Sequence, residues 1–358
     1  MGDSKQQCCS RRKRSDSRRI GMLLALISGV CYGVYSAFLT QAMGTGQWAR
    51  WPREGLLSAY ALTVLLGILA STINDLLSAL WSLLMLLLRG KLGGLVPALR
   101  SSSGRILLGA ALVGGPLASA AYVIALQQAG SLVIPITALC PVIGTLLDRL
   151  FFKQAIRRHM WLGIGICLVA SVCIGATGLS LSLAPMRTLL GAGLALFAAF
   201  GWGLEGCVAG FATKALDYEL GISIRQLTSG LTNLLLLLPL ASCFDIRGLA
   251  LYPDLLQGAL SDPPSLAIFA LSGFFALFAY SLWYKGNSLC GVALGMACNG
   301  SYAFWGPFFC WLLLGVYAGQ TGWDLHPLSW LGALLMVLGI FIIAVNPQDY
   351  LRKLRRRA

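Results

Sequence analysis

The sequence predicts an all-α integral membrane protein with ten transmembrane helices, arranged as two inverted five-helix repeats. Of its 358 residues, 57% are hydrophobic and 11% are charged, and the mean hydropathy is +0.76. Soluble domains carry roughly 25% charged residues. Apolar runs of roughly 20 residues recur along the chain, and a helix needs about that length to cross ~30 Å of hydrocarbon. Lipid is therefore the expected solvent for most of this protein.

The apolar runs define ten expected spans in chain order. These are 20–43, 57–88, 106–127, 131–148, 160–178, 190–212, 226–244, 265–284, 289–316 and 329–346. The first run is too long for a cleaved signal peptide, and no small-residue cleavage site follows it before Arg50. The predicted divisions are a basic, disordered cytoplasmic head (1–19), a first repeat (20–178), a second repeat (190–346) and a basic cytoplasmic tail (347–358).

Basic residues indicate the orientation of the spans. With the N-terminus inside, 23 of the 27 Lys and Arg residues fall in the head, the tail and the inner loops. Only Arg50, Arg53, Arg187 and Arg247 fall outside. The positive-inside rule therefore places both termini in the cytoplasm. Because most of the net charge of +14 lies at membrane edges, we expect anionic lipid rather than nucleic acid as the partner of these segments.

The two halves carry related residues in the same order. Gly21, Leu24 and Gly33 recur 170 residues later as Gly191, Leu194 and Gly203. Gly115 and Tyr122 recur after 158 residues as Gly273 and Tyr280, and Trp161-Leu162-Gly163 recurs after 169 as Trp330-Leu331-Gly332. Each half has an odd number of spans, so spans one and six run in opposite directions. Many secondary transporters have this arrangement, with substrate near the midplane between the halves.

These features resemble the drug/metabolite transporter superfamily, in particular its ten-helix permeases and exporters with two EamA-type halves. The resemblance rests on Tyr122 through Trp161, with a turn at Gly130-Ser131, Pro141 and a basic exit at Lys153, and on Tyr280 to Gly306 in the second half. It covers roughly residues 20–346. It implies a multi-pass protein of the bacterial inner membrane, with an organellar membrane as the alternative, and it admits a homodimer. The long second span and the basic segment after it look more like the sugar-uptake relatives than the compact exporters.

Two acids lie well within the expected spans, Asp75 in span two and Glu205 in span six. Charge inside a membrane is costly, so such acids are presumed functional. Each is a candidate for proton coupling or for counter-charge to a cationic solute. The alternative for both is a hydrogen-bonded structural carboxyl, and Asp75 has the further alternative of lying near an aqueous edge.

Aromatic and polar side chains on the same spans complete the expected binding site. An aromatic cavity with one carboxylate suits an amine, an amino-acid-like solute or a quaternary ammonium ion, and the same rings stack on sugars. Aromatic residues also anchor helices at the interface or fill cores, which is the alternative for these rings. The candidate substrate-binding residues are Glu205, Tyr35, Trp202, Tyr32, Tyr302, Asn299 and Trp305.

Absent motifs narrow the function. We find no Lys or Arg deep in a span, which disfavours anionic phosphate cargo, and neither a metal-ligand set nor a Walker loop. We therefore expect no metal and no cofactor, and we expect a secondary transporter that moves a small neutral or cationic metabolite by alternating access, coupled to protons through Glu205. The alternatives are a sugar or polyol permease and, from another class, a lipid-handling membrane enzyme with Glu205 or Asp75 as general base.

Overall fold

The structure of the protein is a computed structural model that describes residues 2–129, 133–137, 139–153, 157–176, 185–321 and 323–344. These residues form helices joined by short connections, without a strand among them. The expected basic tail 347–358 and the turn at Gly130-Ser131 lie outside the described residues.

Five of the expected spans coincide with helices that are long and apolar enough to cross a membrane. They are Asp16–Met43, Ala61–Leu88, Ser102–Tyr122, Leu189–Ala212 and Pro263–Cys290. The first lies in helix α1 (Gly2–Met43), the fourth in α10 (Pro185–Ala212), and the fifth is α14 (Pro263–Cys290). The predicted helical membrane character is thus confirmed for these five segments by length and composition.

The other expected spans correspond to shorter or interrupted helices. Spans five and ten match α9 (Arg158–Ala176) and α17 (Pro327–Ala344), whose apolar parts are shorter. Span four contains α7 (Val133–Thr137) and α8 (Cys140–Phe152). Span nine contains α15 (Val292–Asn299), α16 (Tyr302–Cys310) and the π-helical segment Trp311–Tyr317, with a break at Gly300-Ser301.

Span seven begins earlier than the sequence predicts. It consists of α11 (Tyr218–Thr232), a π-helical turn and α12 (Leu238–Ser242), whereas the expected start is residue 226. The Asp217 side chain accepts a hydrogen bond from the Glu219 backbone amide and caps the helix at its N-terminus. Polar residues in the first turns therefore belong to the helix and not to a loop.

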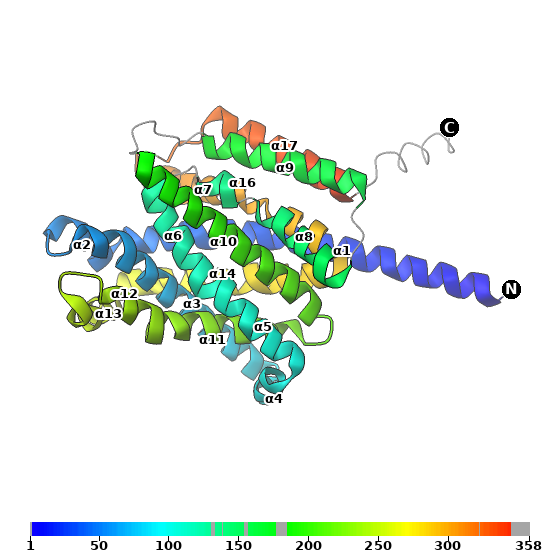
Figure 1. Cartoon of the computed structure of the whole chain (residues 1–358), viewed down its shortest axis with the longest axis horizontal. Helices are drawn as coiled ribbons and strands as arrows, with labels where there is room; N and C mark the ends of the chain where they lie inside the picture. The colour runs from blue at the N-terminus through cyan, green and yellow to red at the C-terminus, as the bar shows by residue number, and fades with distance from the viewer. Residues whose placement is uncertain are drawn as a thin grey trace.

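The first helix is also longer than expected. It begins at Gly2, so residues 2–19 are helical where disorder is expected, and this part projects beyond the other helices (Figure 1). Once a helix has nucleated in an apolar segment, each further residue adds one hydrogen bond, so α1 extends through its polar head.

Contacts along α14 show how α1 and α10 are oriented. Gly21 of α1 packs on Cys290, and the Ser28 hydroxyl donates to the Ala279 carbonyl, so α1 runs antiparallel to α14. On α10, Gly206 packs on Trp283 and Gly210 packs on Asn287, so α10 runs parallel to α14. Helices α1 and α10 therefore run in opposite directions.

Several helices of each half of the chain pack against helices of the other half. Helix α1 packs on α14 and α16, and α10 packs on α6 (Ala118–Ala129) and α8. Helix α3 (Leu66–Leu88) packs on α11, and on the opposite side of the bundle α9 packs on α17 (Figure 1). Each pair joins elements from opposite halves of the chain.

The two ends of the bundle carry different short helices. Helix α2 (Gly46–Glu54), α12 and α13 (Leu251–Leu260) lie together on the left of Figure 1. There the Gln47 amide donates to Asp262 over 2.8 Å. Helix α4 (Leu95–Arg100) lies away from them, beside α5 (Ser102–Leu112).

Candidate functional site

A fully buried arginine, Arg225, lies on α11 at the middle of the bundle. Its Nε donates to Glu205 Oε1 over 2.9 Å, and its Nη1 donates to Gln226 Oε1 over 2.6 Å. The guanidinium carbon lies 3.8 Å from the centroid of the Tyr280 ring, which is a cation–π contact. This position contradicts two expectations: that Arg225 belongs to a cytoplasmic loop, and that the spans lack a deep Lys or Arg.

The partner acid, Glu205 on α10, is also fully buried. Its Oε1 accepts hydrogen bonds from Arg225 and from the Tyr284 hydroxyl, the latter over 2.7 Å. Gly114, in a π-helical turn between α5 and α6, leaves room for the carboxylate, because a β-carbon there would lie 2.1 Å from Oε2. Turns of this kind are frequent at functional sites.

The second acid, Asp75 on α3, faces Arg225 from the first half of the chain. Its Oδ1 lies 3.7 Å from Arg225 Nη1, and its Oδ2 accepts a hydrogen bond from the Ser229 hydroxyl. Asp75 is buried, so its carboxylate is enclosed by other helices. We call Asp75, Glu205 and Arg225 the charged centre.

The charged centre holds one more acid than base. Among the described residues, no second basic side chain forms an ion pair with Asp75 or Glu205. If both acids were ionised, the centre would carry a net charge of −1 in a buried environment, which is costly. A bound proton or a cationic group would neutralise it.

Two atoms of the charged centre have no hydrogen-bond partner: Glu205 Oε2 and Arg225 Nη2. Buried polar atoms without partners are destabilising, by about 1–3 kcal/mol for a typical group. The site therefore retains one acceptor and one donor for a further polar group.

Amide and hydroxyl side chains connect the charged centre to four helices. Gln226 Nε2 donates to the Ser78 hydroxyl over 2.6 Å, which joins α11 to α3. The Ser272 hydroxyl of α14 lies 2.7 Å from Asn74 Oδ1 and 3.0 Å from the Tyr35 carbonyl of α1. A displacement of α3 would therefore disturb this network.

Four tyrosines lie next to the charged centre and form what we call the tyrosine cluster: Tyr32, Tyr35, Tyr280 and Tyr302. The Tyr32 ring centroid lies 4.6 Å from that of Tyr35, 4.5 Å from that of Tyr302 and 6.0 Å from that of Tyr280. Tyr280 links the cluster to Arg225. The structure thus brings three of the predicted aromatic residues together beside Glu205.

The other predicted residues lie outside the charged centre. Trp202 packs on Tyr122, with 5.0 Å between ring centroids, and its Nε1 has no partner. The Asn299 amide donates to the Ser28 hydroxyl over 2.7 Å. Trp305 packs among phenylalanines, including Phe304 at 5.3 Å.

A small, mostly apolar pocket borders the tyrosine cluster through Tyr302. Its walls include Pro141 at the start of α8 and Gly300 between α15 and α16, where the two interrupted spans meet. Ser171 and two cysteines give it a small polar component. The pocket therefore lies beside the candidate site rather than at the charges.

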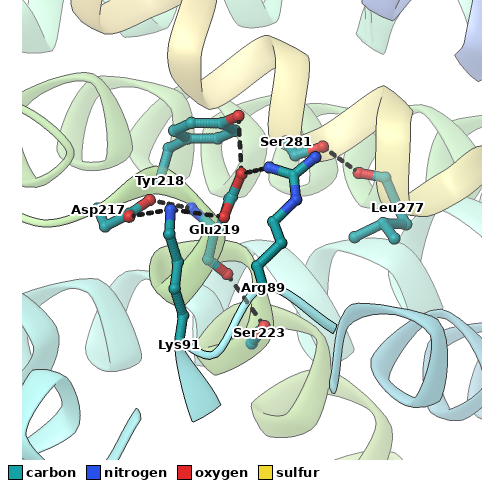
Figure 2. A network of polar contacts seen from close by, with 8 residues as sticks. All are labelled: Arg89, Lys91, Asp217, Tyr218, Glu219, Ser223, Leu277 and Ser281. Atoms are coloured by element: carbon teal, nitrogen blue, oxygen red, sulfur yellow. Dashed lines mark hydrogen bonds and ion pairs between the residues drawn. The ribbon is translucent and has the colours of Figure 1, made fainter. Parts of the chain in front are cut away.

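A second set of charges, which we call the end cluster, joins α3 and α11 at one end of the bundle. Figure 2 shows Arg89 and Lys91, which follow α3, reaching Asp217 and Glu219 at the start of α11. Arg89 pairs with Glu219, and Lys91 Nζ lies 2.7 Å from Asp217 Oδ2 and 2.8 Å from Glu219 Oε2. The Tyr218 hydroxyl also donates to Glu219 over 3.1 Å (Figure 2).

The pKa values of two groups in the end cluster reflect these contacts. Hydrogen bonds to Asp217 and then to Glu219 raise the pKa of Lys91. Partial burial by itself would raise the pKa of Asp217, but its hydrogen bonds with Lys91 and the Glu219 amide outweigh burial and lower it. Both shifts favour the charged forms and therefore the ion pairs of the end cluster.

Sequence reasoning missed Arg225, Gln226, Tyr280 and Tyr284 as site residues. The signal for Arg225 was Asp217, an N-cap residue that indicates a helix start eight positions earlier. The signal for Tyr280 was its recurrence with Tyr122. Nothing in the sequence marks Tyr284 as a partner of Glu205.

Comparisons with known proteins identify the fold alone. No family model and no curated protein matches the chain. Among 27 matching chains of solved structures, one described only as a protein has a TM-score of 0.60 and 18% identity. The match covers 92% of this chain and 96% of the other, so the two share a fold over nearly their whole length.

Proposed function

We propose that this protein is a proton-coupled secondary transporter that moves a small metabolite by alternating access. The observation that carries the proposal is the charged centre, a buried Arg225 between acids that come from opposite halves of the chain. Intramembrane charges of this kind are expensive and mark ion or substrate pathways.

Matching contacts in the two halves support ten spans in two inverted repeats. A β-carbon at Gly115 would lie 2.7 Å from Ser229 Oγ of α11, and one at Gly273 would lie 2.8 Å from Ser78 N of α3. Gly115 and Gly273 are equivalent in the sequence repeat, so their partners Ser229 and Ser78 are equivalent as well.

Ring contacts repeat in the same way. Tyr122 packs on Trp202, and Tyr280 packs on Tyr32, at centroid distances of 5.0 and 6.0 Å. Tyr280 is the repeat position of Tyr122, and Trp202 is that of Tyr32. Together with the opposite directions of α1 and α10, these contacts support a pseudo-twofold axis in the membrane plane, as in other inverted-repeat carriers.

The cargo we propose is a small cationic or neutral metabolite. The excess of one acid in the charged centre favours a cation, or a neutral solute carried with a proton, and the tyrosine cluster offers faces for cation–π contact. The sequence disfavours anionic cargo because no Lys or Arg was expected deep in a span. Arg225 is fully buried, so this argument against anionic cargo no longer holds. A sugar or polyol is the second candidate, because the tyrosine cluster adjoins an apolar pocket.

We further propose that the end cluster is the cytoplasmic gate in its closed state. The proposal places both termini in the cytoplasm of a bacterial inner membrane, on the side where Arg89 and Lys91 lie. The end cluster and the charged centre both join α3 to α11, so separation of these helices would open a path from this end to the centre.

Flux measurements in proteoliposomes test the proposal. A panel of labelled amines, amino acids, sugars and organic anions is offered with and without a pH gradient to the native protein, to Arg225→Gln and to the matched control Arg247→Gln. Arg247 forms an exposed ion pair with Asp254. We expect flux that responds to the gradient, is lost in Arg225→Gln and is retained in the control. Absence of flux for every solute, from folded protein, would refute a transport function.

A further inference from the structure

We infer that Asp75, and not Glu205, is the carboxyl that binds and releases the coupling proton, while Glu205 and Arg225 remain a permanent ion pair. The coupling role of Asp75 rests on the proposed transport function. The assignment of the proton to Asp75 concerns only the charged centre and can be tested without transport. It replaces the sequence-based expectation that coupling acts chiefly through Glu205.

Glu205 is surrounded by donors that favour its ionised form. Arg225 Nε and the Tyr284 hydroxyl both donate to its Oε1. A protonated Glu205 would keep Oε1 as an acceptor for Arg225 Nε but would lose the charge that strengthens this bond, and a guanidinium has no acceptor for the added proton. A proton on Oε2 would face Gly114 without a partner, because Oε2 has none in the structure.

Asp75 is held more loosely and by a partner that adapts. Its distance to Arg225 is 3.7 Å, against 2.9 Å for Glu205. Its other oxygen is bound by the Ser229 hydroxyl, which donates to a carboxylate and can accept from a carboxylic acid. Asp75 can therefore take up a proton from water without losing its hydrogen bond.

The charged and titratable groups that face Asp75 come from four helices. Arg225 on α11 favours its ionised form, and Glu205 on α10 opposes it; Tyr35 on α1 and Tyr280 on α14 are neutral hydroxyl groups within electrostatic range. With Glu205 already paired to the single cation, Asp75 is the acid left in excess. A proton on Asp75 makes the charged centre neutral.

The two acids also differ in which half of the chain they belong to. Arg225, Glu205 and Tyr284 all come from the second half, so their contacts persist if the halves move relative to each other. Asp75 comes from the first half, and its contacts with α11 would be broken by that motion. Protonation of Asp75 would weaken the attraction between α3 and α11 and so couple proton uptake to separation of the halves.

The repeat makes Asp75 equivalent to Gln226 and Asn74 equivalent to Arg225. Because Ser78 and Ser229 contact equivalent glycines, the pair Asn74-Asp75 on α3 is equivalent to Arg225-Gln226 on α11. The pseudo-symmetric positions thus hold an acid and an amide in one half and a base and an amide in the other. Because the equivalent positions differ in charge, the contact between α3 and α11 contains one titratable acid, Asp75.

Infrared difference spectroscopy of the protein in liposomes tests the assignment without any transported solute. The carboxylic-acid C=O band is followed through a pH titration of the native protein, Asp75→Asn, Glu205→Gln and the exposed control Asp254→Asn. We expect a titrating band that disappears in Asp75→Asn and persists in the other two variants. A band lost in Glu205→Gln but retained in Asp75→Asn, or no titrating band in the native protein, would overturn the inference.

Flux measurements then separate this inference from the proposed function. In Asp75→Asn we expect uptake driven by a pH gradient to fall at least tenfold while solute exchange continues, and in Asp75→Glu we expect gradient-driven uptake to return with a displaced pH midpoint. If Asp75→Asn does not fold, the Asp75→Glu midpoint decides: an unchanged midpoint would contradict the assignment. The expected infrared result with no flux in the native protein would refute transport and leave the assignment intact.

Discussion

A double-mutant cycle on Arg225 and Glu205 gives the most direct measure of the charged centre. Arg225→Met preserves an apolar stem but removes the cation, so Glu205 keeps Tyr284 and Asp75 keeps Ser229 as uncharged hydrogen-bond donors. Removing one partner of a buried ion pair costs about 3–5 kcal/mol, and we expect a loss of stability in this range. Glu205→Gln retains a carbonyl acceptor for Arg225 Nε and removes the charge, so a loss of about 1.5–3 kcal/mol is expected.

The double variant Arg225→Met/Glu205→Gln removes both members of the pair and leaves a centre with one titratable acid. Its loss should be smaller than the sum of the single losses, and the coupling energy should be about 1–3 kcal/mol. The free energy of unfolding would be measured in bicelles by reversible denaturation for all four proteins. The same cycle on the exposed pair Arg247 and Asp254 is the control, for which we expect less than about 1 kcal/mol. A coupling energy at the charged centre no larger than in the control would refute the reasoning.

Three further predictions concern the gate, the packing of Glu205 and the topology. The pKa of Lys91 is raised and the pKa of Asp217 is lowered. The contribution of their ion pair to folding stability is therefore lost only as the pH rises through the pKa of Lys91 or falls through the pKa of Asp217. The difference in melting temperature between the native protein and Lys91→Gln should therefore be constant between about pH 5 and pH 9, and a difference that shrinks within this window would contradict it. Gly114→Ala places a methyl group against the Glu205 carboxylate and should reduce stability by about 1–3 kcal/mol and flux severalfold, measured beside Gly109→Ala, which meets open space. Single cysteines introduced in the head and the tail, in a background without other cysteines, should react with an impermeant maleimide only from the cytoplasmic side, and labelling from outside would reverse the proposed orientation.

The sequence was most informative where one-dimensional patterns carry the physics. A run of apolar residues long enough to cross hydrocarbon is a local property, and it correctly located the five long apolar helices. The cost of charge in a membrane identified Glu205 and Asp75. The recurrence of small and aromatic residues indicated which positions in the two halves are equivalent, and Gly115 and Gly273 indeed make corresponding contacts.

The same reasoning failed where polar residues interrupt an apolar run. The first turns of α11 contain Glu219, Ser223 and Arg225, which hydropathy places in a loop before the expected start of span seven at residue 226. In the folded protein Arg225 bonds to Gln226 and to Glu205 of α10 and stacks on Tyr280 of α14, and Gln226 reaches Ser78 of α3. Hydropathy treats each residue as if it faced lipid, whereas a polar residue that faces other helices is not exposed to lipid at all.

By itself, then, the sequence determined the helical membrane character of this chain, the recurrence of residues in its halves and the two acids at its centre. Only the tertiary structure decided that Arg225 lies between those acids and that Tyr280 and Tyr284 complete their surroundings. The reason is that the charged centre is assembled from α3, α10, α11 and α14, and Asp75 lies 154 residues from its hydrogen-bond partner Ser229. Contacts over such separations depend on how helices pack, which no local pattern of residues records.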